Sequence, residues 1–290
     1  MNLFNKIFSY EHDLRPLPEG FVHHRQSLTY LSGESVERLH PEVVGTPGCL
    51  GVRWKNGPLR FETFTSDIEP VVTDDNPCHV IIWEPIRRTD KPKGWCEPWI
   101  RLNVARTGFA HITDTERYDA TWTEHARRHV KKWRKAPTHR IENVTLEAFK
   151  ESYARTGKLA FLRSDFFGIL DRRAKHHGDL LHLYGAINPT TGNIDAGLAV
   201  LDLPDIHTSN HVIAFFHNHA KKTPVNVGLI DHWFRESIAR QMIFLNFGVF
   251  WVPGEPLGWK GFSRFKSQFG LQYIDSPTTY MKFRLPKKIA

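Results

Sequence analysis

Near the end of the chain, three cations and four aromatic rings lie between glycines in the stretch GWKGFSRFKSQFG, residues 258–270. Such a stretch can contact phosphates, pack into a core or place one charge at a reaction centre. Phe262, Phe265 and Phe269 recur at helical spacing, which favours core packing, and we accept that interpretation for Phe262 and Phe269. Phe265 and the cations of the stretch stay open to a functional role.

A second group that can do chemistry is the pair His217 and His219, two of the 17 histidines in the chain. Residues two apart on a strand point to the same side, so this pair could bind a metal together with His211 or Asp231. Neither an HExxH helix nor a cysteine pair at ligand spacing accompanies it. We therefore expect no metal site and assign most histidines to hydrogen bonding.

The segment AKKTPVNVG precedes a predicted helix and is suited to binding an anion. A helix N-terminus offers backbone N–H groups and a partial positive charge to a phosphate or carboxylate. Lys221 and Lys222 add charge, and Gly228 permits close approach. Asn226 is placed to cap the helix, with Val227 beside it. These five residues are our candidate donor-binding set, although an ordinary capped helix explains them equally well.

Several common enzyme classes lack their signatures in this sequence. There is no GxSxG elbow of a serine hydrolase, no P-loop and no GxGxxG turn after a strand. The three cysteines are odd in number and lack CxxC spacing, which argues against a disulfide framework and a thiolate zinc site. We expect them to be reduced and structural.

The second part of the chain contains a basic helix, predicted over residues 121–136 with Thr123 as its cap and Pro137 as its stop. Its apolar face repeats at helical spacing, at Ala126, Val130 and Trp133. Further helices are predicted over 146–156, 164–177 and 226–241. Strands are predicted over 180–188, 194–203, 211–217, 243–250, 271–274 and 280–284.

The first part is β-rich, with strands predicted at GVRW, LRFETF, HVIIWEPI and WIRLNVA. Charge changes along the chain: residues 1–115 carry 13 Lys/Arg against 15 Asp/Glu, whereas residues 116–290 carry 26 against 16. This asymmetry suggests that the second part meets an anionic partner. We expect two domains, with a β-rich N-terminal part over 1–115 and a second domain over 116–290.

Length and hydropathy indicate a globular protein. The 290 residues are 40% hydrophobic, enough to bury a core, and no run approaches the ~20 apolar residues of a membrane span. The N-terminus lacks a charged start followed by an apolar stretch and a small-residue cleavage site. We therefore expect a cytoplasmic protein.

The order of elements after residue 118 resembles the acetyltransferase-like domain of the FemAB family and its BioF2-like relatives, within the GNAT superfamily. The matching stretches cover residues 118–284: HARRHVKKWRK, AGLAVL, HVIAFF, PVNVGLIDHWFRESIARQ and RFKSQFG. The resemblance implies an α/β (α+β) fold, with a mixed, mostly antiparallel sheet flanked by helices. Since FemAB proteins carry two such domains, it also implies that the N-terminal part is a smaller, reduced GNAT-like half.

The resemblance implies transfer of an acyl or aminoacyl group from an acyl-CoA or an aminoacyl-tRNA to an amine. It carries over to Phe265 and Lys266 as the pair beside the transfer site, where the lysine stabilises negative charge or holds the donor. Backbone N–H groups of the strand Ala196–Leu201 are the expected oxyanion donors. No general base is assigned among the candidates Asp231, Glu236, Tyr273 and Tyr280.

The acceptor implied by the resemblance is a small amine or a cell-wall precursor such as a peptidoglycan intermediate. The donor, acyl-CoA or tRNA, stays open, because the phosphates of either suit the basic second part. An alternative is a nucleic-acid-binding protein without catalysis, which uses the same basic half. A degenerate member kept as a scaffold is a third interpretation.

Overall fold

The computed structural model describes residues 15–32, 42–73, 75–87, 90–99, 101–156 and 163–284, with the side chains of Lys221 and Lys222 left out. The chain divides into two compact units. Unit 1 comprises the residues up to Gly108 together with 249–263 and 272–290, and unit 2 comprises 109–248 and 264–271. Because neither unit is a continuous stretch, the division differs from the single cut that we expected between residues 115 and 116.

Unit 1 is built on a five-stranded sheet in the order β1-β2-β3-β4-β12. Its strands are β1 (Glu42–Thr46), β2 (Cys49–Asn56), β3 (Leu59–Ser66), β4 (Val80–Pro85) and β12 (Tyr280–Phe283). Neighbouring strands are antiparallel except β3 and β4, which are parallel. Two short helical segments precede the sheet, η1 (His24–Gln26) and α2 (Leu28–Ser32). The apolar runs at GVRW, LRFETF and HVIIWEPI form β2, β3 and β4 as expected.

The predicted strand at WIRLNVA is wrong, because the described part of this segment has no regular secondary structure and the next strand, β5, begins at Arg106. Side chains hold the segment instead of a backbone ladder. Arg101 donates to the carbonyl of Ser276, and the Asn103 Nδ2 donates to the Pro277 carbonyl at 2.9 Å. One backbone bond accompanies them, from the Ser276 N–H to the Ala105 carbonyl at 3.1 Å, and Pro277, which has no N–H, cannot extend it into a ladder.

The larger sheet has seven strands in the order β11-β5-β10-β9-β8-β7-β6. Its strands are β5 (Arg106–His111), β6 (Arg140–Asn143), β7 (Leu181–Ile187), β8 (Ile194–Leu203), β9 (Thr208–Phe216), β10 (Phe244–Val249) and β11 (Gln272–Asp275). The pairs β6–β7, β7–β8 and β8–β9 are antiparallel, whereas β9 and β10 are parallel. The expected mixed and mostly antiparallel sheet is therefore confirmed.

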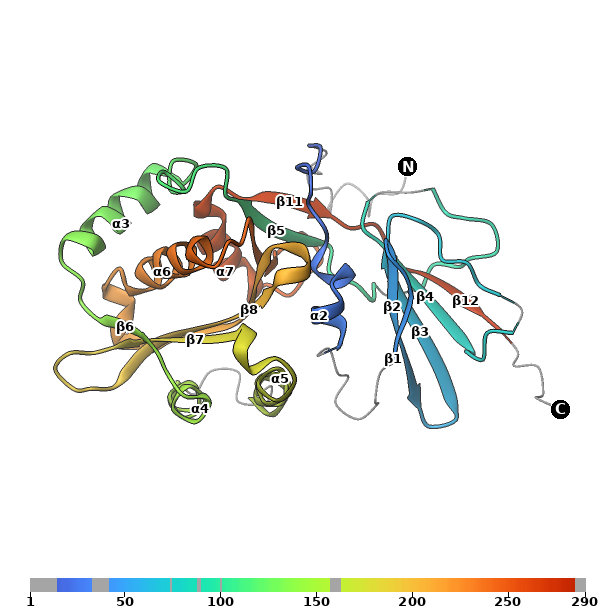
Figure 1. The fold of residues 1–290 in the computed structure, drawn as a ribbon, viewed down its shortest axis with the longest axis horizontal. Coiled ribbons are helices and arrows are strands. Elements are labelled where there is room, and N and C mark those ends of the chain that lie inside the picture. The colour runs from blue at the N-terminus through green and yellow to red at the C-terminus, as the bar shows by residue number, and fades with distance from the viewer. Residues whose placement is uncertain are drawn as a thin grey trace. The chain divides into compact units, whose positions relative to one another are not determined.

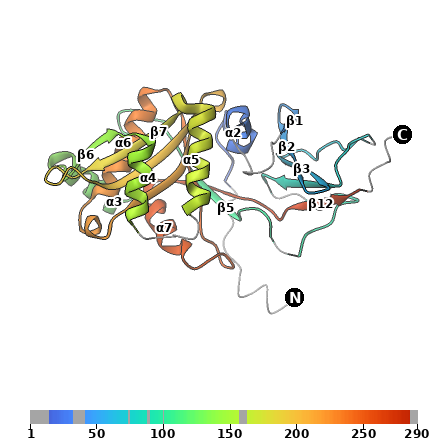
Figure 2. The same ribbon diagram turned by 90° about the horizontal axis from the view of Figure 1, so that it is seen from below.

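Helices cover both faces of this sheet in unit 2. They are α3 (Glu124–Lys135), α4 (Leu146–Arg155), α5 (Arg163–His177) and α6 (Val225–Ala239). Helices α3 and α6 pack together on one face of β7 and β8, and α4 and α5 lie on the other (Figure 1; Figure 2). Helix α7 (Trp259–Lys266) and the 3-10 segments η3 (Gly178–Leu180), η4 (Pro204–Ile206), η5 (Asn218–Lys222) and η6 (Ser267–Phe269) complete the chain. None of the described helices is long and apolar enough to cross a membrane.

Local sequence signals predicted the start of α3 correctly and the start of α6 incorrectly. The Thr123 side chain caps α3 by accepting from the Ala126 N–H, and the predicted apolar face of that helix is buried. Helix α6 instead starts after Pro224, so the prediction that Asn226 caps it is wrong. The fixed φ of proline suits a helix start without a side-chain cap, which leaves Asn226 inside the first turn.

Candidate functional site

Strands β9 and β10 part from each other in the middle of the larger sheet. Their parallel ladder joins Thr208–Asn210 to Phe244–Asn246 and then stops, while β9 continues to pair with β8. We call the region beyond it the fork: His211–Phe215 of β9 with Phe247 and Gly248 of β10. In the described residues, the β10 side of β9 is therefore open from His211 to Phe215.

The fork changes where oxyanion donors can come from. The expected strand Ala196–Leu201 lies in β8, which pairs with β7 on one side and with β9 on the other. A strand paired on both sides has its N–H groups committed to its neighbours. The expectation for Ala196–Leu201 is therefore wrong, and the open edge of the next strand, β9, is the candidate.

A β-bulge lies at the start of the fork. Val200 pairs with His211 and Ala199 with Ile213, so Val212 is an extra residue in β9. Because paired residues share a face, the bulge puts His211 on the α6 side while Ile213 and Phe215 face α4 and are buried. Ala214, on the α6 side, is exposed. The sheet is thus covered on one side of the fork and open on the other.

Lys266, at the end of α7, places a buried ammonium group in this fork. The residue is only 9% exposed, and its Nζ donates to the backbone carbonyl of Phe247, the first β10 residue beyond the ladder. Burial lowers the pKa of Lys266 from 10.5 to about 7. The amine is therefore neutral in a large fraction of molecules near neutral pH, and a neutral amine can accept a proton.

His211 lies beside this lysine. Burial lowers the pKa of His211 well below its ordinary value, and the nearby charge of Lys266 lowers it further. Its ring is therefore uncharged over the physiological range. The sequence singled out His211 only as a possible metal ligand, because no local pattern shows that it meets a residue so far along the chain.

The phenylalanines near Lys266 differ in burial. Phe269 is fully buried and packs against Phe247 with ring centroids 5.8 Å apart, so its predicted core role is confirmed. Phe262 is only half-buried against Trp259, which makes it less central than we expected. Phe265 is also half-buried, with its ring edge-on to Phe269 at 5.2 Å. Its predicted place beside the transfer reaction stays a prediction.

The predicted donor-binding residues lie around the start of α6. Asn226 and Val227 are in its first turn, where backbone N–H groups have no partner within the helix. Gly228 is different, because its N–H already donates to the Pro224 carbonyl at 3.0 Å. A Cβ on Gly228 would lie 2.3 Å from the Trp133 indole, so this glycine lets α6 pack on α3. The side chains of Lys221 and Lys222 lie outside the described ones.

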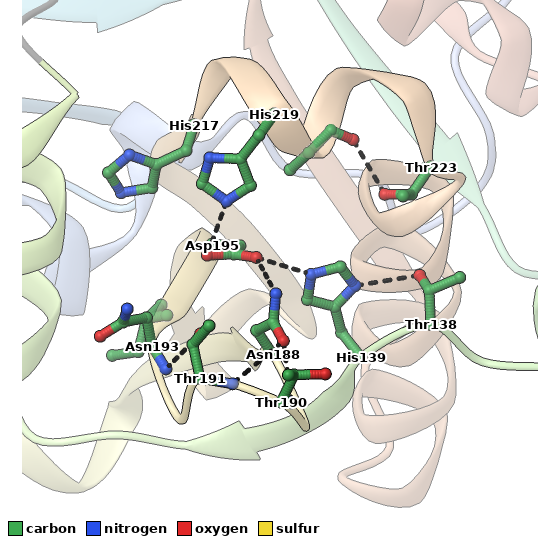
Figure 3. Close-up of polar contacts among 12 residues, drawn as sticks. Thr138, His139, Asn188, Thr190, Thr191, Asn193, Asp195, His217, His219 and Thr223 are labelled. Carbon is green, nitrogen blue, oxygen red and sulfur yellow. Dashed lines mark hydrogen bonds and ion pairs between the residues drawn. The ribbon is translucent and has the colours of Figure 1, made fainter.

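The histidine pair belongs to a network centred on buried Asp195 (Figure 3). His139 Nε2 contacts Asp195 Oδ2 at 3.0 Å, and Asn188 donates to the same oxygen at 2.9 Å. His219, with a side chain 63% exposed, contacts Asp195 Oδ1 at 2.9 Å. His217 instead contacts the Ser152 hydroxyl at 3.2 Å. Asp195 thus ties the start of β8 to η5.

His217 and His219 do not share a strand, because β9 ends at Phe216 and η5 begins at Asn218. Their rings nevertheless stack, with centroids 5.6 Å apart. Within the described residues, no group of three or more His, Cys, Asp or Glu side chains is arranged to hold a metal ion.

Asp231, one of the four general-base candidates, is fully buried but committed to structure. It accepts from Tyr118 at 2.7 Å and pairs with Arg134, which joins α6 to α3. Glu236 lies near Arg240 at 3.5 Å, on the exposed side of α6. The Asp231 carboxylate is thus used in the packing of α6 on α3.

The two tyrosine candidates lie in unit 1. Tyr280 is buried against Trp83, with ring centroids 5.7 Å apart, which is a core position. Tyr273 packs edge-on against Phe250 at 5.1 Å and lies under the Arg106 guanidinium. Both tyrosines thus have packing roles in unit 1.

Comparison with known proteins finds a likeness in structure only. No protein-family model matches the sequence, and no curated protein matches it. FemX is similar over 89% of this chain and 91% of its own, with a TM-score of 0.65 at 10% identity. A protein of unknown function from Bacteroides thetaiotaomicron is similar over 90% of this chain and 92% of its own, with a TM-score of 0.61 at 13% identity.

A third similar structure is the C-terminal DUF2156 domain of a candidate lysylphosphatidylglycerol synthetase from Agrobacterium fabrum. It matches 84% of each chain with a TM-score of 0.52 at 10% identity. At such identities the likeness shows the fold alone. The likeness to FemX confirms the FemAB-like fold that the motifs suggested, over more of the chain than residues 118–284.

Proposed function

We propose that this protein is a FemAB-like N-acyltransferase or aminoacyltransferase that moves an acyl or aminoacyl group from an acyl-CoA or aminoacyl-tRNA to an amine. One observation carries the proposal: a buried lysine with a pKa of about 7 lies where β9 and β10 part. The FemX-like fold supports the reaction class by analogy. The role of Lys266 follows from its own surroundings.

In this mechanism Lys266 removes the proton that the attacking amine must lose. The amine nitrogen forms a bond to the donor carbonyl carbon, and the carbon–sulfur or carbon–oxygen bond to the donor breaks. The proton passes from the amine to the neutral Lys266 and then to the leaving sulfur or oxygen. A general base is most effective when its pKa is near the working pH, which the burial of Lys266 achieves. This base role replaces the charge-stabilising role first considered.

The open edge of β9 supplies the second requirement, donors for the oxygen that becomes negative. Backbone N–H groups between His211 and Phe215 are our candidates, because the ladder to β10 stops at Asn210. Exposed Ala214 leaves room for an extended donor arm along this strand. We infer that the donor carbonyl lies at the His211 end.

The far end of the same strand leads into the start of α6, which we propose holds the donor phosphates. The first-turn N–H groups of Asn226 and Val227 are suited to an anion, and Lys221 and Lys222 would add charge. Gly228 contributes by keeping α6 close to α3 rather than by contact. The acceptors to test are small amines and peptidoglycan precursors, and because cells make both donors in the cytoplasm, we place the reaction there.

The test is a transfer assay with the purified full chain. Acetyl-CoA or a mixture of charged tRNAs is offered with a panel of amines that includes a peptidoglycan precursor, and products are identified by mass. Lys266→Met removes the base at similar size. Lys260→Met is the matched control, because Lys260 is an exposed lysine of the same helix.

Transfer by the wild type and the Lys260→Met variant, with at least about a 100-fold loss in Lys266→Met, would support the proposal. If neither donor yields product with any acceptor in the panel, or if Lys266→Met transfers as fast as the wild type, the proposed function is wrong. Tight binding of tRNA that Lys266→Met does not alter, without transfer, would favour a charge-driven binder.

A further inference from the structure

The fork contains a second nitrogen base whose role the proposed reaction does not yet use. His211 is the first β9 residue beyond the ladder, and Phe247, whose carbonyl accepts from Lys266, is the first β10 residue beyond it. The two strands therefore bring the imidazole and the amine to the same point of the sheet. The bulge at Val212 keeps His211 on the α6 face, which the buried residues Ile213 and Phe215 do not share.

We infer that His211 is a positioning residue for Lys266, and that its neutral imidazole lies beside the amine at the apex of the fork without taking up the proton itself. This inference rests on the proposed function for its purpose, but the electrostatic interaction between the two residues can be tested without any substrate.

The electrostatic interaction between the two groups determines which of them carries the extra proton. The charge of Lys266 acts on His211, so the two groups are close enough to disfavour simultaneous protonation. Because the pKa of His211 lies well below its ordinary value, the extra proton stays on Lys266 rather than on the imidazole. A proton taken from the attacking amine therefore passes from Lys266 to the leaving sulfur or oxygen.

The charged groups on the neighbouring helices are either held elsewhere or exposed. On α6, Asp231 is held by Arg134 and Tyr118. On α7 itself, Arg264 is exposed. On β10, the Phe247 carbonyl accepts a hydrogen bond from Lys266. On β9, the charge of Lys266 lowers the pKa of His211. Changing the charge at residue 211 should therefore act directly on Lys266.

The first experiment measures the protonation of Lys266 without activity. Trace acetic anhydride labels neutral amines, and mass spectrometry of the Lys266 peptide at a series of pH values gives the midpoint of its titration. Three forms of the full chain are compared: wild type, His211→Gln and His211→Asp. His176→Asp is the matched control, because it adds the same charge at an exposed site on α5.

We expect a midpoint near pH 7 in the wild type and the control, and a change of less than half a pH unit in His211→Gln. His211→Asp places an anion beside the ammonium and should raise the midpoint by at least one unit. If that variant does not fold by circular dichroism, His211→Ala replaces it, since water entering the gap should also raise the midpoint. A midpoint that neither variant moves would overturn the inference.

The second experiment follows transfer against pH. A midpoint raised by about one unit lowers the neutral fraction of Lys266 about fivefold at pH 7 and restores it by pH 9, so His211→Asp should lose and regain rate over this range. A rate reduced equally at every pH would indicate a merely structural role and contradict the inference. If the midpoint moves as expected but no donor reacts in the wild type, the pair stands and the proposed function fails.

Discussion

Buried polar groups have different partners at two places along β9: the end that pairs with β10, and the point where the fork begins. At the end joined to β10, the Ser209 hydroxyl accepts from Trp233 at 2.8 Å, and the neighbouring Asp202 accepts from Arg240 at 2.6 Å. At the fork, the Lys266 ammonium is buried against a backbone carbonyl, and the neutral His211 is beside it. A buried acid is matched by an arginine at the first end, whereas a buried cation meets a carbonyl at the second.

This difference distinguishes groups along β9 that stabilise the fold from groups that are suited to chemistry. A carboxylate that accepts from an arginine is held in its charged form, whereas burial of an ammonium favours its neutral form and costs stability. A destabilising group at an active site is one way in which proteins exchange stability for activity. The comparison therefore supports our proposal that the fork is the functional end and that the Asp202 end is its support.

The largest expected effect is on activity at the fork. Lys266→Met should reduce transfer at least about 100-fold, because the proton acceptor is gone. The same variant should raise the melting temperature by several degrees, because a buried amine is replaced by an apolar chain of similar size. Transfer rates and thermal unfolding of the same preparations measure both effects. A Lys266→Met protein that is less stable than the wild type would contradict our account of the fork.

The reverse result is expected at the other end of the strand. Burial alone would raise the pKa of Asp202, but hydrogen bonds from His182 and Arg240 outweigh it and hold the pKa below its ordinary value. Asp202 therefore stabilises the fold at neutral pH and ceases to do so as the pH falls through its folded pKa. Asp202→Asn should lower the free energy of unfolding by about 2–3 kcal/mol.

Denaturant unfolding at pH 7 measures that loss, and transfer per folded molecule should stay within about twofold of the wild type. An Asp202→Asn variant with unchanged stability but lost activity would contradict the distinction between a stabilising Asp202 and a functional fork.

A smaller effect is expected where α6 packs on α3. A Cβ on Gly228 would lie 2.3 Å from the Trp133 ring, so Gly228→Ala should destabilise the protein by about 1–3 kcal/mol. Gly261→Ala is the matched control, because a Cβ there meets nothing within 4 Å and α7 is helical. The control should be stabilising by about 0.5–1 kcal/mol. Equal effects of the two substitutions on the denaturation midpoint would show that the packing contact is unimportant.

The last expected effect is a slope of the free energy of unfolding with pH. The pKa of Lys266 is about 7 in the folded state and 10.5 ordinarily, so between these values the unfolded chain binds the extra proton. The free energy of unfolding should therefore rise with pH in this range, by up to about 1.4 kcal/mol per unit. The advantage of Lys266→Met over the wild type should shrink accordingly from pH 7 to pH 9. A constant difference would mean that Lys266 is charged throughout.

The sequence correctly predicted the helix starts and turns that depend on residues close together in the chain. Thr123 starts α3 because its hydroxyl reaches an N–H three residues on, and the β7–β8 hairpin turns where Pro-Thr-Thr-Gly-Asn allows it. These effects act within a few residues, so a local pattern contains them. The longer helices of unit 2 and most strands followed from such patterns, whereas the class of fold followed from the family resemblance.

What the sequence could not predict depends on distant partners. The last strand, β12, pairs with β4 of unit 1, so a boundary drawn from a change in composition separated residues that belong together. His211 and Lys266 meet because one ladder ends early, which no hydropathy pattern records. Gly228 was interpreted as space for a ligand, but the space is filled by Trp133. In each case non-local packing, rather than residue type, decided the outcome.

The extra residue in β9 changes the path of that strand rather than the direction of its side chains. Val212 has no partner of its own in β8, because Val200 pairs with His211 and Ala199 with Ile213. Deleting Val212 would leave both pairs on their present faces, since neighbours on a regular strand point to opposite sides. The loss would fall on the bend and the added twist that a bulge gives a strand, and so on the direction in which β9 leaves β10. A chain without Val212 should therefore keep its apolar core and have a narrower opening between the two strands.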